Sequence, residues 1–341
     1  MLHLRIVTPS ETAQSTLELL CGSASVCNVV HLPGAARRPD GDVVLCDIAR
    51  EDASVILSDL RELDIPSQGS IAIDEIDTQI SDAADRAEEA AAGVPADAVV
   101  WEEVEFRTSE EAALSVVFLT FMVLAMLIAM SGIFLDTPIL IVGAMVVGPE
   151  FGPIAGVCVA LVERQGKLAL QSGLALLVGF PLGIVATLLV ALAFRALGIT
   201  PGDFDPDEQT LSKIIANPDF FTFFVAFCAG VVGILSLSTA KSGALIGVLI
   251  SVTTIPAAAN IGVTVAYGDW GSAGGSLGQL AINLSTILLA GTLVLWLQRR
   301  LYRRRRREHL RDPVRAAAGL PLGRSRRQRS RVSGFLRRAG R

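Results

Sequence analysis

One acidic residue, Glu150, stands inside a long apolar stretch, flanked by Gly148-Pro149 and by Phe151-Gly152-Pro153. An ionised carboxylate is costly in apolar surroundings, so such a residue usually has a partner or a wet cavity. Glu150 is therefore a candidate proton or cation site. The alternatives are a structural acid that bonds to backbone carbonyls freed by the prolines, and a segment that lies less deep than its composition indicates.

Two further apolar stretches, within residues 243–266 and 276–298, supply more polar side chains. Asn260 and Asn283 offer amide donors and acceptors. Three hydroxyls precede Pro256, those of Ser251, Thr253 and Thr254. Taken singly, Ser and Thr in apolar helices more often bond to their own preceding turn. Together with Glu150 and the unwound carbonyls of a helix break, we expect these groups to line a transport or ligand-binding site.

Two Gly/Pro-rich segments must position these side chains. They cover residues 141–157 and 245–263, and they contain Pro149, Pro153 and Pro256. Proline removes a backbone donor, and an apolar medium has no water to compensate for the lost bond. Paired breaks in corresponding spans of two halves are typical of a transport site near the membrane midplane. The alternative is two proline-kinked helices without symmetry, whose glycines only permit close packing.

The apolar part predicts a polytopic α-helical membrane domain over residues 111–298. We expect six spans, because each stretch is close to the roughly 20 residues that a bilayer requires. They cover residues 112–134, 138–162, 168–197, 219–238, 243–266 and 276–298. Basic residues fall in alternate loops, which predicts cytoplasmic N- and C-termini in the cell (plasma) membrane. Three spans followed by three oppositely directed spans predict a 3+3 inverted repeat.

Residues 1–78 predict a small soluble α+β domain in the cytoplasm. Expected strands cover residues 2–7, 26–32, 43–48 and 70–76. One expected helix ends near residue 21, and a second covers residues 51–63. Residues 33–41 predict a turn. The order β-α-β-β-α-β is ferredoxin-like. Fold alone does not assign a ligand, so a structural or assembly module and a sensor both remain open. Residues 79–110 predict a charged, helical linker.

Charge separates the two ends of the chain. Residues 1–110 hold 22 acidic and 7 basic side chains, whereas residues 299–341 hold 2 acidic and 17 basic ones. We expect the tail to bind anionic lipid of the inner leaflet. The expected lipid-binding residues are Arg303, Arg304, Arg305, Arg306 and Arg307. Contact with the acidic N-terminal domain is an alternative, and the scarcity of aromatic residues disfavours a nucleic acid.

Catalytic and metal-binding patterns are missing from the sequence. It contains no Walker A loop, HExxH motif or dinucleotide fingerprint. Its histidines, His3, His31 and His309, lie outside the apolar part, so we expect neither an enzyme nor a cofactor. The cysteines lack the clustered spacing of a metal site, and we expect reduced packing residues. They are Cys21, Cys27, Cys46, Cys158 and Cys228.

Several short motifs lie in the same apolar part. They are Gly143-Ala-Met, Pro149, Gly152-Pro-Ile, residues 229–237, residues 247–262 and Asn283-Leu284. In these motifs the chain resembles the membrane family known as domain of unknown function 389, over about residues 110–300. The resemblance implies a hydrophobic domain that follows a small soluble one, without an established activity. Glu150 departs from the family pattern, in which an apolar residue is usual.

The sequence thus favours a secondary transporter or channel-like permease for a small solute or ion. Its cytoplasmic domain would regulate or assemble it, and Gly-rich spans favour a homo-oligomer. The alternative is a non-transporting membrane sensor or scaffold, whose ferredoxin-like domain binds a ligand or partner.

Overall fold

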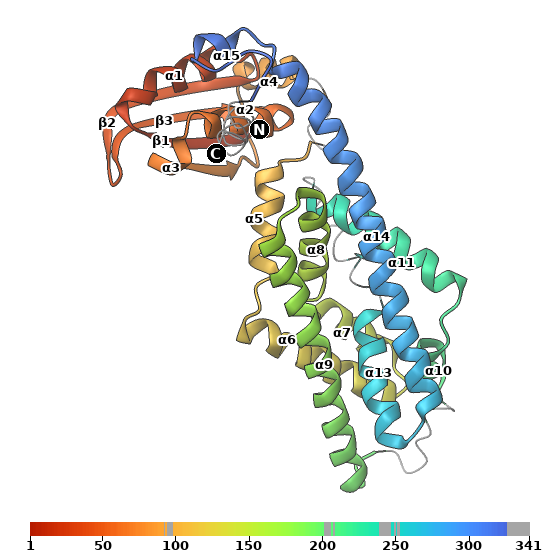
Figure 1. Cartoon of the computed structure of the whole chain (residues 1–341). Helices are drawn as coiled ribbons and strands as arrows, with labels where there is room; N and C mark the ends of the chain where they lie inside the picture. The colour runs from red at the N-terminus through yellow and green to blue at the C-terminus, as the bar shows by residue number, and fades with distance from the viewer. Residues whose placement is uncertain are drawn as a thin grey trace, which may run out of the picture. The chain divides into compact units, whose positions relative to one another are not determined.

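The structure is a computed structural model that describes residues 1–91, 93, 98–200, 206, 209–238, 247–248, 250 and 253–325. Ser251, part of the predicted span 243–266 and the last part of the predicted tail lie outside these residues. The chain forms two compact units (Figure 1). The first contains residues 1–102 and the residues from 298 onward, and the second contains residues 103–297.

The first unit contains a four-stranded antiparallel sheet in the order β2-β3-β1-β4. Its strands are β1 (Leu2–Thr8), β2 (Val26–Arg37), β3 (Asp40–Ile48) and β4 (Ser70–Glu75). The helices α1 (Ser10–Gly22), α2 (Arg50–Glu62), α3 (Ile65–Gln68), α4 (Asp82–Ala90) and α15 (Val314–Ala317) accompany it. The predicted order of four strands and two long helices is thus confirmed, with α3 as a short addition.

Alternation along β1 explains how the sheet obtains its core. Leu2, Leu4 and Ile6 are fully buried, and they alternate with partly exposed or exposed residues, as a strand with one buried face requires. They pack in one cluster with Leu19 of α1 and Leu60 of α2.

The hairpin between β2 and β3 differs from the prediction. Residues 33–37 belong to β2 rather than to a turn, and the turn is reduced to Arg38-Pro39. The pairing register shifts between Leu32 and Ala36, so an irregularity in the strand accommodates Pro33 and Gly34.

Residues near the C-terminal end of the described chain complete this same core. Ala318 and Leu320 are buried in the cluster that contains Leu4 and Leu19, and Val314 packs against it. The described part of the predicted tail is therefore folded into the first unit.

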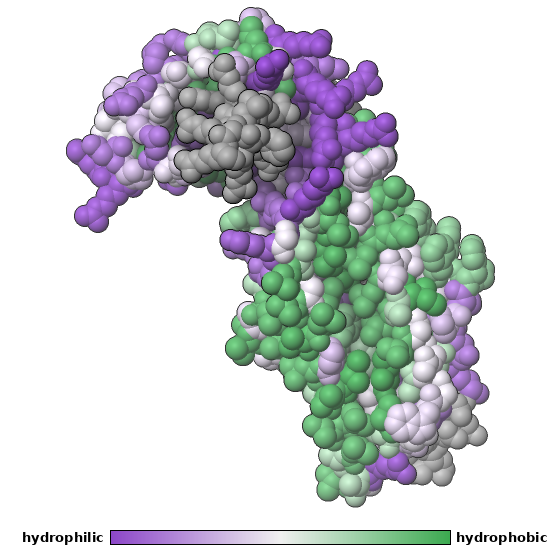
Figure 2. All heavy atoms as spheres, in the orientation of Figure 1, coloured by the Kyte–Doolittle hydropathy of each residue, from purple (hydrophilic) through white to green (hydrophobic). Residues whose placement is uncertain are grey.

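The second unit is helical. It contains α6 (Val116–Phe134), α7 (Pro138–Val147), α8 (Phe151–Glu163), α9 (Gly166–Ala196), α10 (Thr210–Ala216), α11 (Phe220–Ser238) and α13 (Thr254–Tyr267). Helix α5 (Trp101–Glu111) leads into this unit, and α14 (Trp270–His309) leads out of it. Side chains of α6, α9 and α13 form most of its buried core. Hydrophobic residues also cover much of its visible surface (Figure 2).

Four of the described helices, α6, α9, α11 and α14, are long and apolar enough to cross a membrane. Helices α7 and α8 are bent by 49° at their junction and would add a fifth span if they count as one. The described residues do not confirm six spans or a 3+3 inverted repeat. The reason lies in α13, whose 14 residues fall short of the roughly 20 that a span needs, while much of the chain before it lies outside the described residues.

The predicted break in the first Gly/Pro-rich segment is confirmed. The bend between α7 and α8 falls at Gly148-Pro149-Glu150. Pro153 is the third residue of α8, and Pro256 is the third residue of α13. A proline in the first turn is tolerated because the amides of that turn have no partner within the helix. These two prolines therefore begin helices rather than interrupt them.

Candidate functional site

A cavity of about 550 Å³ lies in the second unit. Its lining comes from α10, α11, α14, the loop between α10 and α11, and Thr253, which directly precedes α13. The lining residues are Lys213, Ile214, Ile215, Asn217, Asp219, Phe221, Thr222, Val225, Ala226, Thr253, Gln279 and Asn283. Its volume falls within the range of small-molecule sites, which is about 300–1,000 Å³.

Three polar side chains in this lining hold one another. Gln279 and Asn283 are four residues apart on α14, so they share one face of that helix. Gln279 Nε2 donates to Thr253 Oγ1 at 2.9 Å, and Asn283 Nδ2 donates to the same oxygen at 3.0 Å. Gln279 and Asn283 are 4% and 2% exposed. We call these three residues the amide cluster.

The amide cluster keeps a free hydrogen-bonding group. Gln279 Oε1 is buried and accepts no hydrogen bond within the described part of the chain. A buried acceptor without a partner costs about 1–3 kcal/mol. A donor group on a ligand, or a coordinated ion, would remove this cost.

Charged side chains occur only among the more exposed residues of the cavity lining. Lys213 and Asp219 carry opposite charges, and both are exposed. Asp219 Oδ1 accepts the backbone N–H of Thr222 at 2.9 Å, which lowers the pKa of this carboxyl group. The cavity thus combines a neutral polar cluster with one positive and one negative group.

Glu150 lies at the bend between α7 and α8 and does not line this cavity. Its side chain is buried, and the hydroxyl of Thr254 donates to Oε1 at 2.6 Å. Its other oxygen, Oε2, has no hydrogen-bond partner among the described residues. Thr253 and Thr254 are therefore neighbours in the chain that serve two different polar centres.

The side chain of Asn260 forms hydrogen bonds to two other helices. Ser212 Oγ of α10 donates to Asn260 Oδ1 at 3.0 Å, and Asn260 Nδ2 donates to Ser276 Oγ of α14 at 2.9 Å. Asn260 is fully buried and does not line the cavity. Its side chain thus connects α13 to α10 and α14.

Two of the remaining predicted positions, Gly148 and Pro149, lie at the bend. Gly148 and Pro149 line a second cavity of about 370 Å³, together with Glu110 and Glu111. The predicted set is therefore divided: Thr253 and Asn283 reach the larger cavity, and Glu150 and Thr254 form a separate pair. Gln279, Lys213 and Asp219 were not predicted. Gln279 could have been predicted, because it lies four residues before Asn283 in an apolar helix and so on the same helix face.

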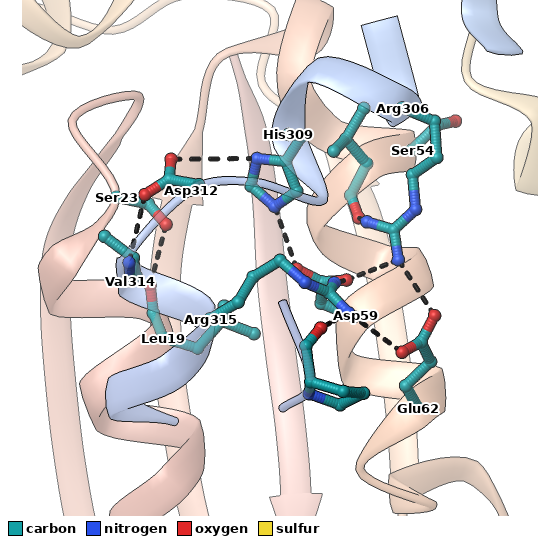
Figure 3. A network of polar contacts seen from close by, with 12 residues as sticks. Leu19, Ser23, Ser54, Asp59, Glu62, Arg306, His309, Asp312, Val314 and Arg315 are labelled. Atoms are coloured by element: carbon teal, nitrogen blue, oxygen red, sulfur yellow. Dashed lines mark hydrogen bonds and ion pairs between the residues drawn. The ribbon is translucent and has the colours of Figure 1, made fainter. Parts of the chain in front are cut away.

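A third polar centre lies within the first unit and involves Arg306, one of the predicted lipid-binding arginines (Figure 3). Asp59 of α2 is fully buried and bonds to Arg306, His309 and Arg315. Glu62 also bonds to both arginines, at 3.0 Å each. Burial lowers the pKa of the His309 imidazole, and the Arg306 guanidinium lowers it further. The sequence left open that the basic tail contacts the acidic N-terminal domain instead of lipid. The contacts of Arg306 and Arg315 with Asp59 and Glu62 agree with that alternative.

The other predicted lipid-binding arginines differ in exposure. Arg305 pairs with Asp52 at 3.0 Å. Arg303, Arg304 and Arg307 are exposed. Of the five predicted arginines, these last three are the most exposed to solvent.

Taken together, the described chain is mostly helical, with four candidate apolar spans and a small N-terminal antiparallel sheet. This combination is compatible with a membrane protein that carries a small additional domain. Residues 145–289 match the family described as Domain of unknown function (DUF389), so the resemblance seen in the motifs is confirmed over this stretch. The matched stretch contains Glu150 and the whole amide cluster.

The chain is also similar to an uncharacterized protein of Methanocaldococcus jannaschii. The two are 27% identical over 201 residues, which cover 56% of this chain and 58% of the relative. The chain thus spans less than two thirds of the relative's length. No solved structure matches the chain.

Proposed function

We propose that this protein is a multi-pass membrane permease that passes a small polar solute or ion through the unit of residues 103–297. The main support for this proposal is the amide cluster at the 550 Å³ cavity. Polar side chains in an apolar helical unit are costly and commonly mark substrate pathways. We assign the protein no catalytic step.

The chemistry of the amide cluster indicates the kind of solute. Thr253, Gln279 and Asn283 are neutral, so they supply hydrogen bonds without a compensating charge. Lys213 and Asp219 add one charge of each sign to the lining. A small neutral or zwitterionic solute, or a monovalent ion, fits this arrangement better than a multivalent ion does.

The finer architectural features belong to the same proposal. The sheet order β2-β3-β1-β4 supports a ferredoxin-like domain with a regulatory or assembly role. Exposed Arg303, Arg304 and Arg307 support contact with anionic lipid. Six membrane crossings, a homo-oligomeric state, location in the plasma membrane and cytoplasmic termini complete the proposal.

Flux through reconstituted protein tests this function. The full chain is placed in liposomes, and osmotic swelling is followed by light scattering with urea, glycerol, glycine, NaCl or KCl as the probe. We expect at least one probe to enter faster than into empty liposomes. Asn283→Ala and Gln279→Leu should slow that entry about tenfold, because each change removes a hydrogen-bonding group worth about 1–3 kcal/mol.

Thr120→Val is the matched control, because Thr120 is exposed on α6 and bonds only to Val116 O of its own helix. It should leave the rate unchanged. If all five probes enter at the rate of empty liposomes, the permease assignment is wrong. If Asn283→Ala and Gln279→Leu match the wild type, the cavity is not the pathway.

A further inference from the structure

Glu150 is a buried acid to which the cavity assigns no role. One carboxylate oxygen accepts from Thr254, and the other has no partner among the described residues. The backbone fits closely around it, since a Cβ on Gly148 would overlap with Glu150 Oε2. A buried carboxylate with a single donor is a feature that calls for an explanation.

Two opposing influences act on the charge of Glu150. Dry surroundings favour a neutral carboxyl group, because an unpaired buried charge is costly. Two helix N-termini favour the ionised form, since Glu150 directly precedes α8 and bonds to the first residue of α13. Each form therefore has a structural feature that stabilises it.

Among the described residues, no basic side chain bonds to the carboxylate of Glu150. The charged residues that line the smaller cavity together with Gly148 and Pro149 are Glu110 and Glu111. No basic side chain lines that cavity among the described residues. An added proton is then the simplest means of removing the charge of Glu150.

The first turn of α13 connects Glu150 to the amide cluster. Thr254 donates to Glu150, and Thr253, the preceding residue, accepts from Gln279 and Asn283. A planar peptide bond joins the two threonines, so a shift of one displaces the other. A change at Glu150 can therefore reach the amide cluster, and a change at the amide cluster can reach Glu150, through these two adjacent residues.

We propose that Glu150 is a proton-binding site coupled to the amide cluster through Thr253 and Thr254. The carboxylate takes one proton from water and later returns it, without any other bond being made or broken. This inference rests on the proposed function, for which it supplies a coupling ion. The cavity would then change its access or affinity with the protonation of Glu150.

The test follows the cavity itself and needs neither a substrate nor transport. In the full chain in detergent, Thr222→Cys places a thiol in the cavity lining. Its alkylation by a maleimide is measured by peptide mass spectrometry between pH 5 and 8.5, with and without Glu150→Gln. The thiol's own ionisation is common to both proteins, so their rate ratio isolates the effect of Glu150.

We expect this ratio to change at least threefold across the pH range. Thr254→Val should make it constant, and Thr254→Ser should preserve its change, because only serine keeps the hydroxyl. A thiol from Thr120→Cys, outside the cavity, should give a constant ratio. A constant ratio at position 222, with folded protein, overturns the coupling.

The outcomes separate the two proposals. A changing ratio without flux of any probe supports the proton site and rejects the permease. Flux with a constant ratio supports the permease and rejects the coupling.

Discussion

Glu150 and Gly148 form a closely fitted pair at the bend between α7 and α8. A side chain at position 148 would meet both Glu150 Oε2 and Ile255 Cγ1, the latter at 2.7 Å. Glycine is therefore required here by the approach of α13 and by the carboxylate. Its φ of −62° is ordinary, so contact rather than backbone conformation imposes the requirement.

Gly148→Ala tests this fit. We expect a loss of about 1–3 kcal/mol of stability, which is typical of overpacking in a filled core. Thermal unfolding of the full chain in detergent measures the effect. Gly143→Ala is the matched control within α7, because a Cβ there meets nothing within 4 Å. Equal unfolding temperatures for the two variants would contradict the fit.

The sequence predicted the chemical types at the site better than their grouping. Glu150, Thr253 and Thr254 follow from polar side chains near prolines in an apolar part, and Asn283 follows from an amide inside an apolar helix. Their division between two centres does not follow, because it depends on how α13 meets α8 and α14. Contacts between helices that are distant in the sequence leave no periodic pattern, so the bonds of Asn260 to Ser212 and Ser276 could not be predicted either.

At the scale of elements, proline positions decide where helices begin. The predicted break at Gly148-Pro149 is a bend of 49°, whereas Pro153 and Pro256 lie in first turns. Proline in an apolar segment can therefore mark either a bend between two helices or the first turn of a helix. Local sequence alone does not distinguish these two cases. The strands and helices of residues 1–75 were easier to predict, because alternation and amphipathic faces mark them directly.

The β2–β3 hairpin contains an acid that several donors stabilise. The N–H of Gly34 donates to Asp42 at 3.0 Å, His31 Nε2 lies 2.8 Å away, and Ser10 donates at 2.8 Å. These contacts lower the pKa of Asp42 from 3.8 to about 2. The folded pKa lies below the unfolded one, so ionised Asp42 stabilises the fold above about pH 4.

This contribution should be lost as the pH falls from about 4 to about 2. Asp42→Asn removes the charge at every pH. We therefore expect its unfolding temperature to lie below that of the wild type at pH 6, with the gap closing towards pH 2. Thermal unfolding of the full chains at stepwise lower pH measures the gap. A gap that stays constant down to pH 2 would show that the charge of Asp42 contributes nothing.

At the scale of the whole molecule, both flanks of the apolar unit return to one compact unit. Residues 1–102 and 298–325 share a core and the ion pairs of Asp59 and Glu62. If residues 103–297 cross a membrane, as we propose, they must start and finish on the same side. The number of crossings is then even, which favours four or six over five.

Removal of the C-terminal segment tests this shared unit. A chain that ends after residue 325 should keep the folded N-terminal domain. A chain that ends after residue 311 loses Ala318, Leu320 and Arg315, and with Arg315 it loses one ion pair each of Asp59 and Glu62. Breaking a buried ion pair costs about 3–5 kcal/mol, so we expect faster proteolysis of residues 1–102 in the shorter chain. Equal protection in both chains would show that the domain is complete without this segment.

A domain built from both ends of a chain also sets an order of events during synthesis. Leu320 leaves the ribosome roughly 220 residues after Glu102, which at about 5–20 residues per second is on the order of 10–40 s later. All the apolar helices emerge in this interval, while Asp59 and Glu62 still lack Arg306 and Arg315. The N-terminal domain thus becomes complete only after the apolar helices have been made.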